Sequence, residues 1–125
     1  MEPQELIRRY RAGERDFILL SLRQSRLRGA ELYEANLSGS DLREADLAEA
    51  NLVGARLRRA DLGWANLDGA DLGGADLGSA NLRGASLREA NLSYANLQGS
   101  NVSPGQLAEA SSLQGTTLPD GTQHE

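Results

Sequence analysis

The sequence of 125 residues contains no cysteine and no lysine, and it has only one histidine, one phenylalanine and one tryptophan. The absence of cysteine excludes disulfide bonds and cysteine-ligated metal sites. The single histidine, His124, stands next to the last residue. The sequence therefore lacks the histidines that a Ser/His/Asp triad or a histidine-rich metal site would require. We therefore expect a non-catalytic protein with no metal and no cofactor.

Long apolar runs are also absent. The longest one extends only from Phe17 to Leu20, whereas a membrane-spanning helix needs about 20 apolar residues. The segment from Met1 to Glu5 lacks the basic stretch and apolar run of an export signal. The net charge is −5 and all thirteen basic residues are arginine, which makes broad attraction to nucleic acid unfavourable. These features predict a cytoplasmic protein without membrane or nucleic-acid partners.

One pattern fills most of the chain, because an apolar residue recurs at every fifth position. We call this residue the centre of each repeat. Alanine, or sometimes serine, stands two positions before most centres, aspartate or asparagine often stands directly before the centre, and the two positions after it vary freely. The repeat is therefore A-[DN]-L-x-x. It runs without insertion through eighteen centres, which are Phe17, Leu22, Leu27, Leu32, Leu37, Leu42, Leu47, Leu52, Leu57, Leu62, Leu67, Leu72, Leu77, Leu82, Leu87, Leu92, Leu97 and Val102.

A period of five excludes the two ordinary secondary structures. On an α-helix each step of five residues advances about 500°, or about 140° net, so the leucines would spread around the whole helix. In a flat strand an odd period sends successive leucines to opposite faces. The chain must instead turn once in each repeat, with every centre on a common axis and a small alanine at each corner. The predicted structural core includes Phe17, Leu22, Leu42, Leu62, Leu82 and Val102.

This repeat resembles that of the pentapeptide-repeat family, and the resemblance covers about residues 15–104. It implies an all-β solenoid, a right-handed quadrilateral β-helix in which four repeats, or about twenty residues, form each coil. Residues about twenty positions apart should then stack in columns. Such stacking would place Asn36 between Asp16 and Arg56, and Asp41 over Asp61. Arg43 should pair with both of these aspartates on the surface.

The N-terminal segment, residues 1–14, is predicted to be a capping helix. Pro3 suits the first helical position and Gly13 the position after the end. Leu6, Ile7 and Tyr10 share one face of this helix. We expect that face to pack on the segment from Phe17 to Leu20 and so to cover the open end of the solenoid.

The C-terminal segment, residues 105–125, departs from the repeat. Ser103 is a candidate helix cap and Pro104 suits the first helical position. Leu113 and Leu118 no longer fall on the five-residue series that ends at Val102. The segment resembles the closing part of short pentapeptide-repeat proteins, which are abundant in cyanobacteria. The resemblance implies a second cap. The turn signal Pro119-Asp120-Gly121 and the position at the chain end predict a loose tail over residues 122–125.

A candidate partner surface lies between Arg59 and Arg83, where the sequence has no basic residue. Trp64 takes an outward position there, and a column places it between Glu44 and Gly84. An exposed tryptophan with an acidic rim is typical of an interface anchor. Alternatively, Trp64 only packs over the small Gly84. The aspartates of this candidate surface are Asp61, Asp68, Asp71 and Asp76.

Two functional classes follow. The favoured one is a non-catalytic structural or protein–protein interaction module, monomeric, with an unidentified protein partner. The alternative is implied by the family resemblance, since some members imitate duplex DNA, bind DNA gyrase and protect bacteria from quinolones. Residues 15–104 carry twelve acids and ten arginines, a net charge of only −2. A surface that imitates DNA needs sustained negative charge, so the charge distribution favours the interaction module.

Overall fold

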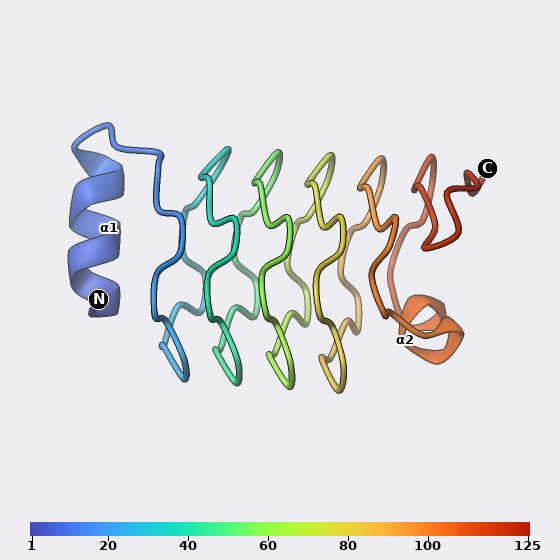
Figure 1. Cartoon of the computed structure of the whole chain (residues 1–125), viewed down its shortest axis with the longest axis horizontal. Coiled ribbons are helices and arrows are strands. Elements are labelled where there is room, and N and C mark those ends of the chain that lie inside the picture. Colours follow the sequence, from blue (N-terminus) through green and yellow to red (C-terminus); the bar gives the residue numbers. More distant parts are fainter.

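The computed structural model describes residues 1–125, which form a rod of stacked coils with a short helix near each end (Figure 1). The helices are α1 (Pro3–Arg11) and α2 (Pro104–Ala108). The coils contain isolated parallel β-bridges in place of continuous strands, and most bridges join residues twenty positions apart, such as Asp41 with Asp61. Four bridges give each coil four sides, one for each repeat, in agreement with the predicted twenty-residue coil.

Each repeat is held by four backbone hydrogen bonds, one of which joins the N–H of Glu44 to the carbonyl of Gly63 in the next coil at 2.9 Å. The N–H of the centre Leu42 donates to the carbonyl of Asp61 in the next coil at 2.8 Å, and the N–H of Asp61 donates back to Ser40 at 3.0 Å. At the corner, the N–H of Ala45 donates to the carbonyl of Leu42 at 3.1 Å. The chain thus alternates a one-residue bridge with a tight turn, which explains why a period of five suits neither a helix nor a flat strand.

The second position after each centre has a restricted backbone. Its φ is +59° at Glu44, +61° at Trp64 and +72° at Gly84. A positive φ at the third residue of a four-residue turn defines a type II turn, which favours glycine, and other residues lose about 1–2 kcal/mol there. The residue type at this position varies as expected, whereas its backbone conformation is the same from repeat to repeat.

The position before each centre serves the turn and the stacking. Asp61 Oδ1 accepts a hydrogen bond from the N–H of Gly63 at 3.0 Å, and it accepts another from Asn81 Nδ2 in the next coil at 2.8 Å. Asn51 similarly accepts from the N–H of Val53 at 3.1 Å. Aspartate and asparagine recur here because their short side chains bond a backbone N–H two residues ahead.

The core is one continuous column of centres and corner residues. Leu42 and Leu62 are 0% exposed, as are the corner residues Ala45 and Ala60. Each buried leucine stabilises the fold by about 1.5–3 kcal/mol relative to an exposed one. The other predicted core residues are also buried, namely Phe17, Leu22, Leu82 and Val102.

Helix α1 lies across the N-terminal end of the rod (Figure 1). Pro3 occupies its first turn, Leu6 is fully buried and Tyr10 is 8% exposed. The hydroxyl of Tyr10 donates to the carbonyl of Tyr33 at 2.8 Å, which satisfies one acceptor on the edge of the first coil. Because an open solenoid end exposes both apolar surface and unpaired backbone groups, α1 stabilises this end in two ways.

Two of the apolar residues expected beneath α1 lie elsewhere. Ile18 is 44% exposed and Leu19 is 76% exposed, so the helix does not cover them. Leu19 occupies a turn position with a φ of +56°. Its side chain lies over Gly39, where a Cβ would come within 2.7 Å of Leu19 Cδ2. The expectation was wrong for these two residues because positions after the centre point away from the axis.

Helix α2 takes the place of one side of the last coil and buries none of its residues. Its predicted cap is present, since the N–H of Gln106 donates to Ser103 Oγ at 3.1 Å and the N–H of Ser103 donates to Gln106 Oε1 at 2.8 Å. Gln106 Nε2 also donates to the carbonyls of Leu82 and Ala85 at 2.6 and 2.9 Å. Gln106 therefore satisfies edge acceptors that α2 leaves without a bridging strand.

The C-terminal end is closed by a further stretch of coil. One extra residue in the α2 segment shifts the spacing, so Asn91 bridges to Ser112 and Asn96 bridges to Thr117. Gln123 then pairs with Thr117 in the antiparallel direction. The N–H of His124 donates to the carbonyl of Thr116 at 2.8 Å. The expectation of a loose tail is wrong for this segment, because its backbone completes the last edge.

Candidate interaction surface at Trp64

Trp64 is largely exposed, but one face of its ring packs against the protein. Its side of the rod belongs to the repeat of Leu62, and the residue is 66% exposed. A Cβ placed on Gly84 would lie 2.3 Å from Trp64 Cε3, so the indole ring lies directly over that glycine. The two alternatives for Trp64 are therefore compatible, because one face of the ring packs while the other remains open to solvent.

The same arrangement occurs at another corner of the rod. Tyr94 is 63% exposed, and a Cβ on Gly115 would lie 2.5 Å from its ring carbon Cδ1. Tyr94 is not among the residues that the sequence alone indicated. The signal was an aromatic residue followed by glycine in the next coil, but the extra residue near α2 moves that glycine from the twentieth to the twenty-first position.

The four aspartates of the candidate surface do not gather around Trp64. Consecutive repeats occupy consecutive sides of the coil, and each of these aspartates belongs to a different side. Asp61 is in the same repeat as Trp64, whereas Asp68, Asp71 and Asp76 belong to the three repeats that follow. The run without arginine in the sequence therefore forms a ring around the rod, not an acidic patch on one face.

Each of these aspartates also has a partner within the rod. Asp76 Oδ1 lies 3.4 Å from Arg58 Nη1. Asp71 Oδ1 accepts from the N–H of Gly73 at 3.0 Å. Asp68 Oδ1 accepts from the N–H of Arg88 at 3.0 Å. Their carboxylates are therefore engaged in the turns and ion pairs that hold the coils together.

The charges next to Trp64 are mixed in sign. Arg43 Nη2 lies 2.8 Å from Asp41 Oδ2, and Arg43 Nε lies 3.7 Å from Asp61 Oδ2. Gly63 stands over Arg43, since a Cβ at this glycine would lie 3.8 Å from Arg43 Cγ. We define the Trp64 surface as Trp64, Gly84, Gly63, Arg43 and Asp61. It presents an aromatic anchor beside an ion-paired lattice.

The pair formed by Asp41 and Arg43 gives a pH-dependent prediction. The side-chain hydrogen bond from Arg43 lowers the pKa of Asp41 from 3.8 to about 2. A lowered pKa in the folded state means that this carboxylate stabilises the protein above its unfolded pKa of about 3.9 and that the contribution is lost as the pH falls through about 2. We expect Asp41→Asn to cost about 1 kcal/mol at neutral pH, a value reduced for solvent screening.

Urea unfolding of the wild type and Asp41→Asn at several pH values measures this effect. The difference in free energy of unfolding between the two proteins should shrink as the pH falls from about 4 to about 2. Glu89→Gln is a suitable control, because Glu89 is exposed and its carboxylate forms no ion pair or hydrogen bond within the protein. A difference between wild type and Asp41→Asn that stays constant over this range would contradict the assigned pair.

The packing of Trp64 on Gly84 gives a second prediction. Alanine at Gly84 must adopt a φ of +72° and would also displace the indole ring, whereas alanine at Gly29 meets a φ of +68° but no atom within 4 Å. Both variants should lose about 1–2 kcal/mol from the backbone. Gly84→Ala should lose about 1–3 kcal/mol more through overpacking and should shift the tryptophan emission. Equal losses in the two variants would contradict the packed ring.

The remainder of the surface offers no metal-binding cluster. No group of three or more histidine, aspartate or glutamate side chains is arranged to hold a metal ion. Neither α1 nor α2 has the length and apolar character that a membrane-crossing helix requires. The Trp64 surface consists of one aromatic ring, small residues and paired charges.

Comparison with known families places the chain. The family model for pentapeptide repeats matches residues 25–63 and 65–103 with eight copies. These segments are more than half of the chain, and the chain belongs to the pentapeptide repeat family. The prediction made from the five-residue period is thus confirmed. A search of curated protein sequences finds no match.

Solved structures similar to this chain include other pentapeptide repeat proteins. One from Nostoc is 46% identical, with 81% of this chain and 75% of that chain covered and a TM-score of 0.34. One from the thylakoid lumen of Arabidopsis thaliana is 26% identical, with 74% and 72% covered and a TM-score of 0.48. The fluoroquinolone resistance protein QnrB1 is 17% identical, with 83% and 62% covered and a TM-score of 0.50. That last likeness concerns the fold alone.

Proposed function

We propose that this chain is a non-catalytic protein–protein interaction module and that the Trp64 surface contacts its partner. The observation that carries the proposal is the position of the Trp64 side chain. The residue is 66% exposed, yet its ring lies over Gly84. A ring that is already held in place loses little conformational entropy when a partner binds. Tryptophan is also among the residues most enriched at the energetic centres of interfaces.

The arrangement of charge supports this function over imitation of DNA. Arginines sit among the acids and pair with them, as Arg23 does with Glu44 at 3.2 Å and Arg58 does with Asp76 at 3.4 Å. A DNA-like surface must instead carry many uncompensated negative charges at the spacing of phosphates. We expect no inhibition of purified DNA gyrase in a supercoiling assay. Inhibition at stoichiometric protein would overturn the proposal in favour of gyrase binding.

The proposal is tested by affinity capture from the source cells with three immobilised proteins. These are the wild type, Trp64→Ala and Tyr94→Ala, where Tyr94 supplies a matched aromatic residue seated on a glycine at another corner. A partner of the Trp64 surface should be recovered by the wild type and Tyr94→Ala but reduced at least about tenfold with Trp64→Ala. Equal recovery by all three proteins would exclude the Trp64 surface as the contact.

Three further features belong to this proposal. We infer a right-handed sense for the coils from the family resemblance. We infer a monomer in solution and a location in the cytoplasm from the charged surface and from the sequence pattern. Light scattering on the purified chain tests the oligomeric state, with a mass twice that of the monomer as the contradicting result.

A further inference from the structure

The N-terminal end of the rod differs strongly in charge from the rest of the chain. Residues 1–30 contain seven arginines and four acids, whereas residues 31–125 contain six arginines and fourteen acids. The net charge is therefore +3 in the first segment and −8 in the second. The first segment comprises α1 and most of the first coil. An acidic protein thus presents one basic end, and charge of this kind attracts anionic partners.

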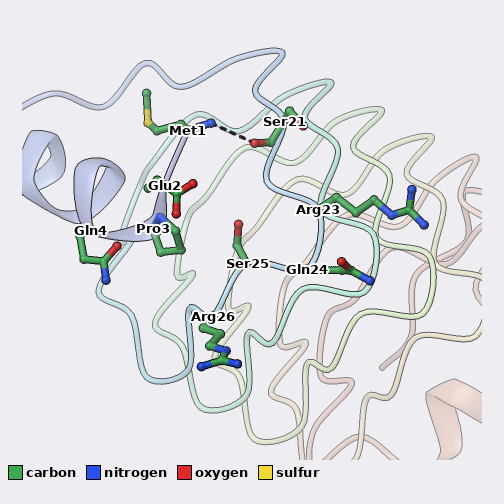
Figure 2. Close-up of a pocket in the computed structure, with 9 residues that line it drawn as sticks. All are labelled: Met1, Glu2, Pro3, Gln4, Ser21, Arg23, Gln24, Ser25 and Arg26. Carbon is green, nitrogen blue, oxygen red and sulfur yellow. Dashed lines mark hydrogen bonds between the residues drawn. The ribbon is translucent and has the colours of Figure 1, made fainter.

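A groove runs between α1 and the first coil at this basic end. Figure 2 shows its first part, a hollow of about 490 Å³ with the start of α1 on one side and residues 21–26 on the other. Arg26 also borders two further hollows of about 360 and 340 Å³, and both of these reach Ile7 and Arg11 of α1. The three hollows are neighbours because all of them are lined by Arg26, and we call them together the groove; half-buried Ile7 lines two of them.

Two arginines of this groove have no acidic partner. Arg11 and Arg26 are exposed and form no ion pair, whereas Arg8 is paired with Glu5. Arg28 lies beside them, and its contacts to acids are long, at 3.8 Å and 3.9 Å. Unpaired arginines on both walls of one groove provide forked donors that suit carboxylates.

The coil wall of the groove is also an open backbone edge. The N–H and carbonyl of Arg26 and the carbonyl of Arg28 form no hydrogen bond within the protein. One coil later the equivalent groups are paired, since the N–H of Asp46 donates to Ser25 at 2.9 Å and the carbonyl of Asp46 accepts from Leu27 at 2.8 Å. The edge at Arg26 can therefore accept one more extended segment by strand addition.

We propose that this groove binds an extended acidic polypeptide segment. Its backbone pairs with the open groups of Arg26 and Arg28, its carboxylates reach Arg11 and Arg26, and an apolar side chain contacts Ile7. The open N–H and carbonyl match a peptide backbone, which carries both a donor and an acceptor in each residue. A phosphodiester chain or a lipid headgroup offers acceptors without this alternation. The groove is separate from the Trp64 surface and does not depend on it.

The test uses the full chain and two capped synthetic peptides. One peptide alternates glutamate with valine, and its control carries glutamine in place of glutamate. We expect the glutamate peptide to bind, with an affinity that falls as salt rises, and the glutamine peptide to bind at least about tenfold more weakly. In NMR spectra the glutamate peptide should shift the amide signals of Arg26 and of its neighbours in the first coil.

Variants locate the site and keep the proposal falsifiable. The pair Arg11→Gln and Arg26→Gln, combined in one protein, should weaken binding by about tenfold, the effect expected from two partly exposed ion pairs. Arg59→Gln is the matched control, because Arg59 is also exposed and without an ion pair but lies on another side. Circular dichroism must show both proteins folded. Equal binding by both variants, absence of glutamate-peptide binding, or tighter binding of anionic vesicles or duplex DNA than of this peptide would overturn the proposal.

Discussion

Leu62→Arg is expected to unfold the protein. Leu62 is 0% exposed and its column neighbours Leu42 and Leu82 are buried as well, so the guanidinium would lie in an apolar core without a carboxylate. A buried unpaired charge costs about 3–5 kcal/mol or more. The loss of the leucine adds about 2 kcal/mol. Since domains of this size are stable by about 5–15 kcal/mol, the variant should lose most or all of its folded population.

The matched control for this variant is Leu19→Arg. Both substitutions replace a leucine in the repeat region by arginine, but Leu19 is 76% exposed. Circular dichroism and thermal melting of the two variants measure the contrast. The control should melt within a few degrees of the wild type. A Leu62→Arg protein that melts as the wild type does would mean that the centres of the repeats do not form the core.

The sequence predicts the coil because one physical constraint repeats. Every fifth residue must reach a common axis, and the corner before it has room only for a small residue, so the order of leucine and alanine defines both the turn and the core. The aspartate or asparagine before the centre has a local role, since it bonds the N–H two residues ahead. These constraints are short in range and can be read from one repeat.

Three features were harder to predict. The positive φ at the second position after the centre follows from the turn geometry. Residues as different as Trp64 and Glu44 adopt it, so the residue type at this position does not reveal the backbone conformation. The aspartates between Arg59 and Arg83 are close in sequence, but each of them lies on a different side of the coil. The final coil was missed because α2 adds one residue, which moves Leu113 and Leu118 off the repeat without removing them from the stack.

The groove beside α1 illustrates the same limit. Its arginines come from two distant segments, with Arg11 in the helix and Arg26 in the first coil. Their proximity depends on how the helix crosses the end of the rod. The unpaired edge at Arg26 is likewise a consequence of its place in the first coil, since an identical repeat further along would have a neighbour on both sides. The ends of a solenoid therefore carry information that the repeat itself does not.

We expect the cap at the N-terminal end to keep the rod from associating. Removal of residues 1–13 is expected to make the protein associate, because it uncovers the first coil. The deletion takes Leu6 and Tyr10 away from the core cluster that also contains Phe17 and Leu32, which are 3% and 0% exposed in the complete chain. The burial of these two helix residues contributes about 3–6 kcal/mol before the entropy of ordering the helix. The carbonyl of Tyr33 also loses its donor.

Light scattering and thermal melting compare three proteins, which are the full chain, the chain without residues 1–13, and Tyr10→Phe. The last variant removes only the hydrogen bond to Tyr33 and should remain a monomer with a loss of about 0.5–1.5 kcal/mol. The shortened chain should melt at a lower temperature and form dimers or larger species through its open edge and apolar end. Association that increases with protein concentration would identify the exposed end as its cause. A shortened chain that remains a monomer and melts at the same temperature as the full chain would show that α1 is not a cap. An end that needs a cap should associate or lose stability once its backbone edge and apolar core are uncovered.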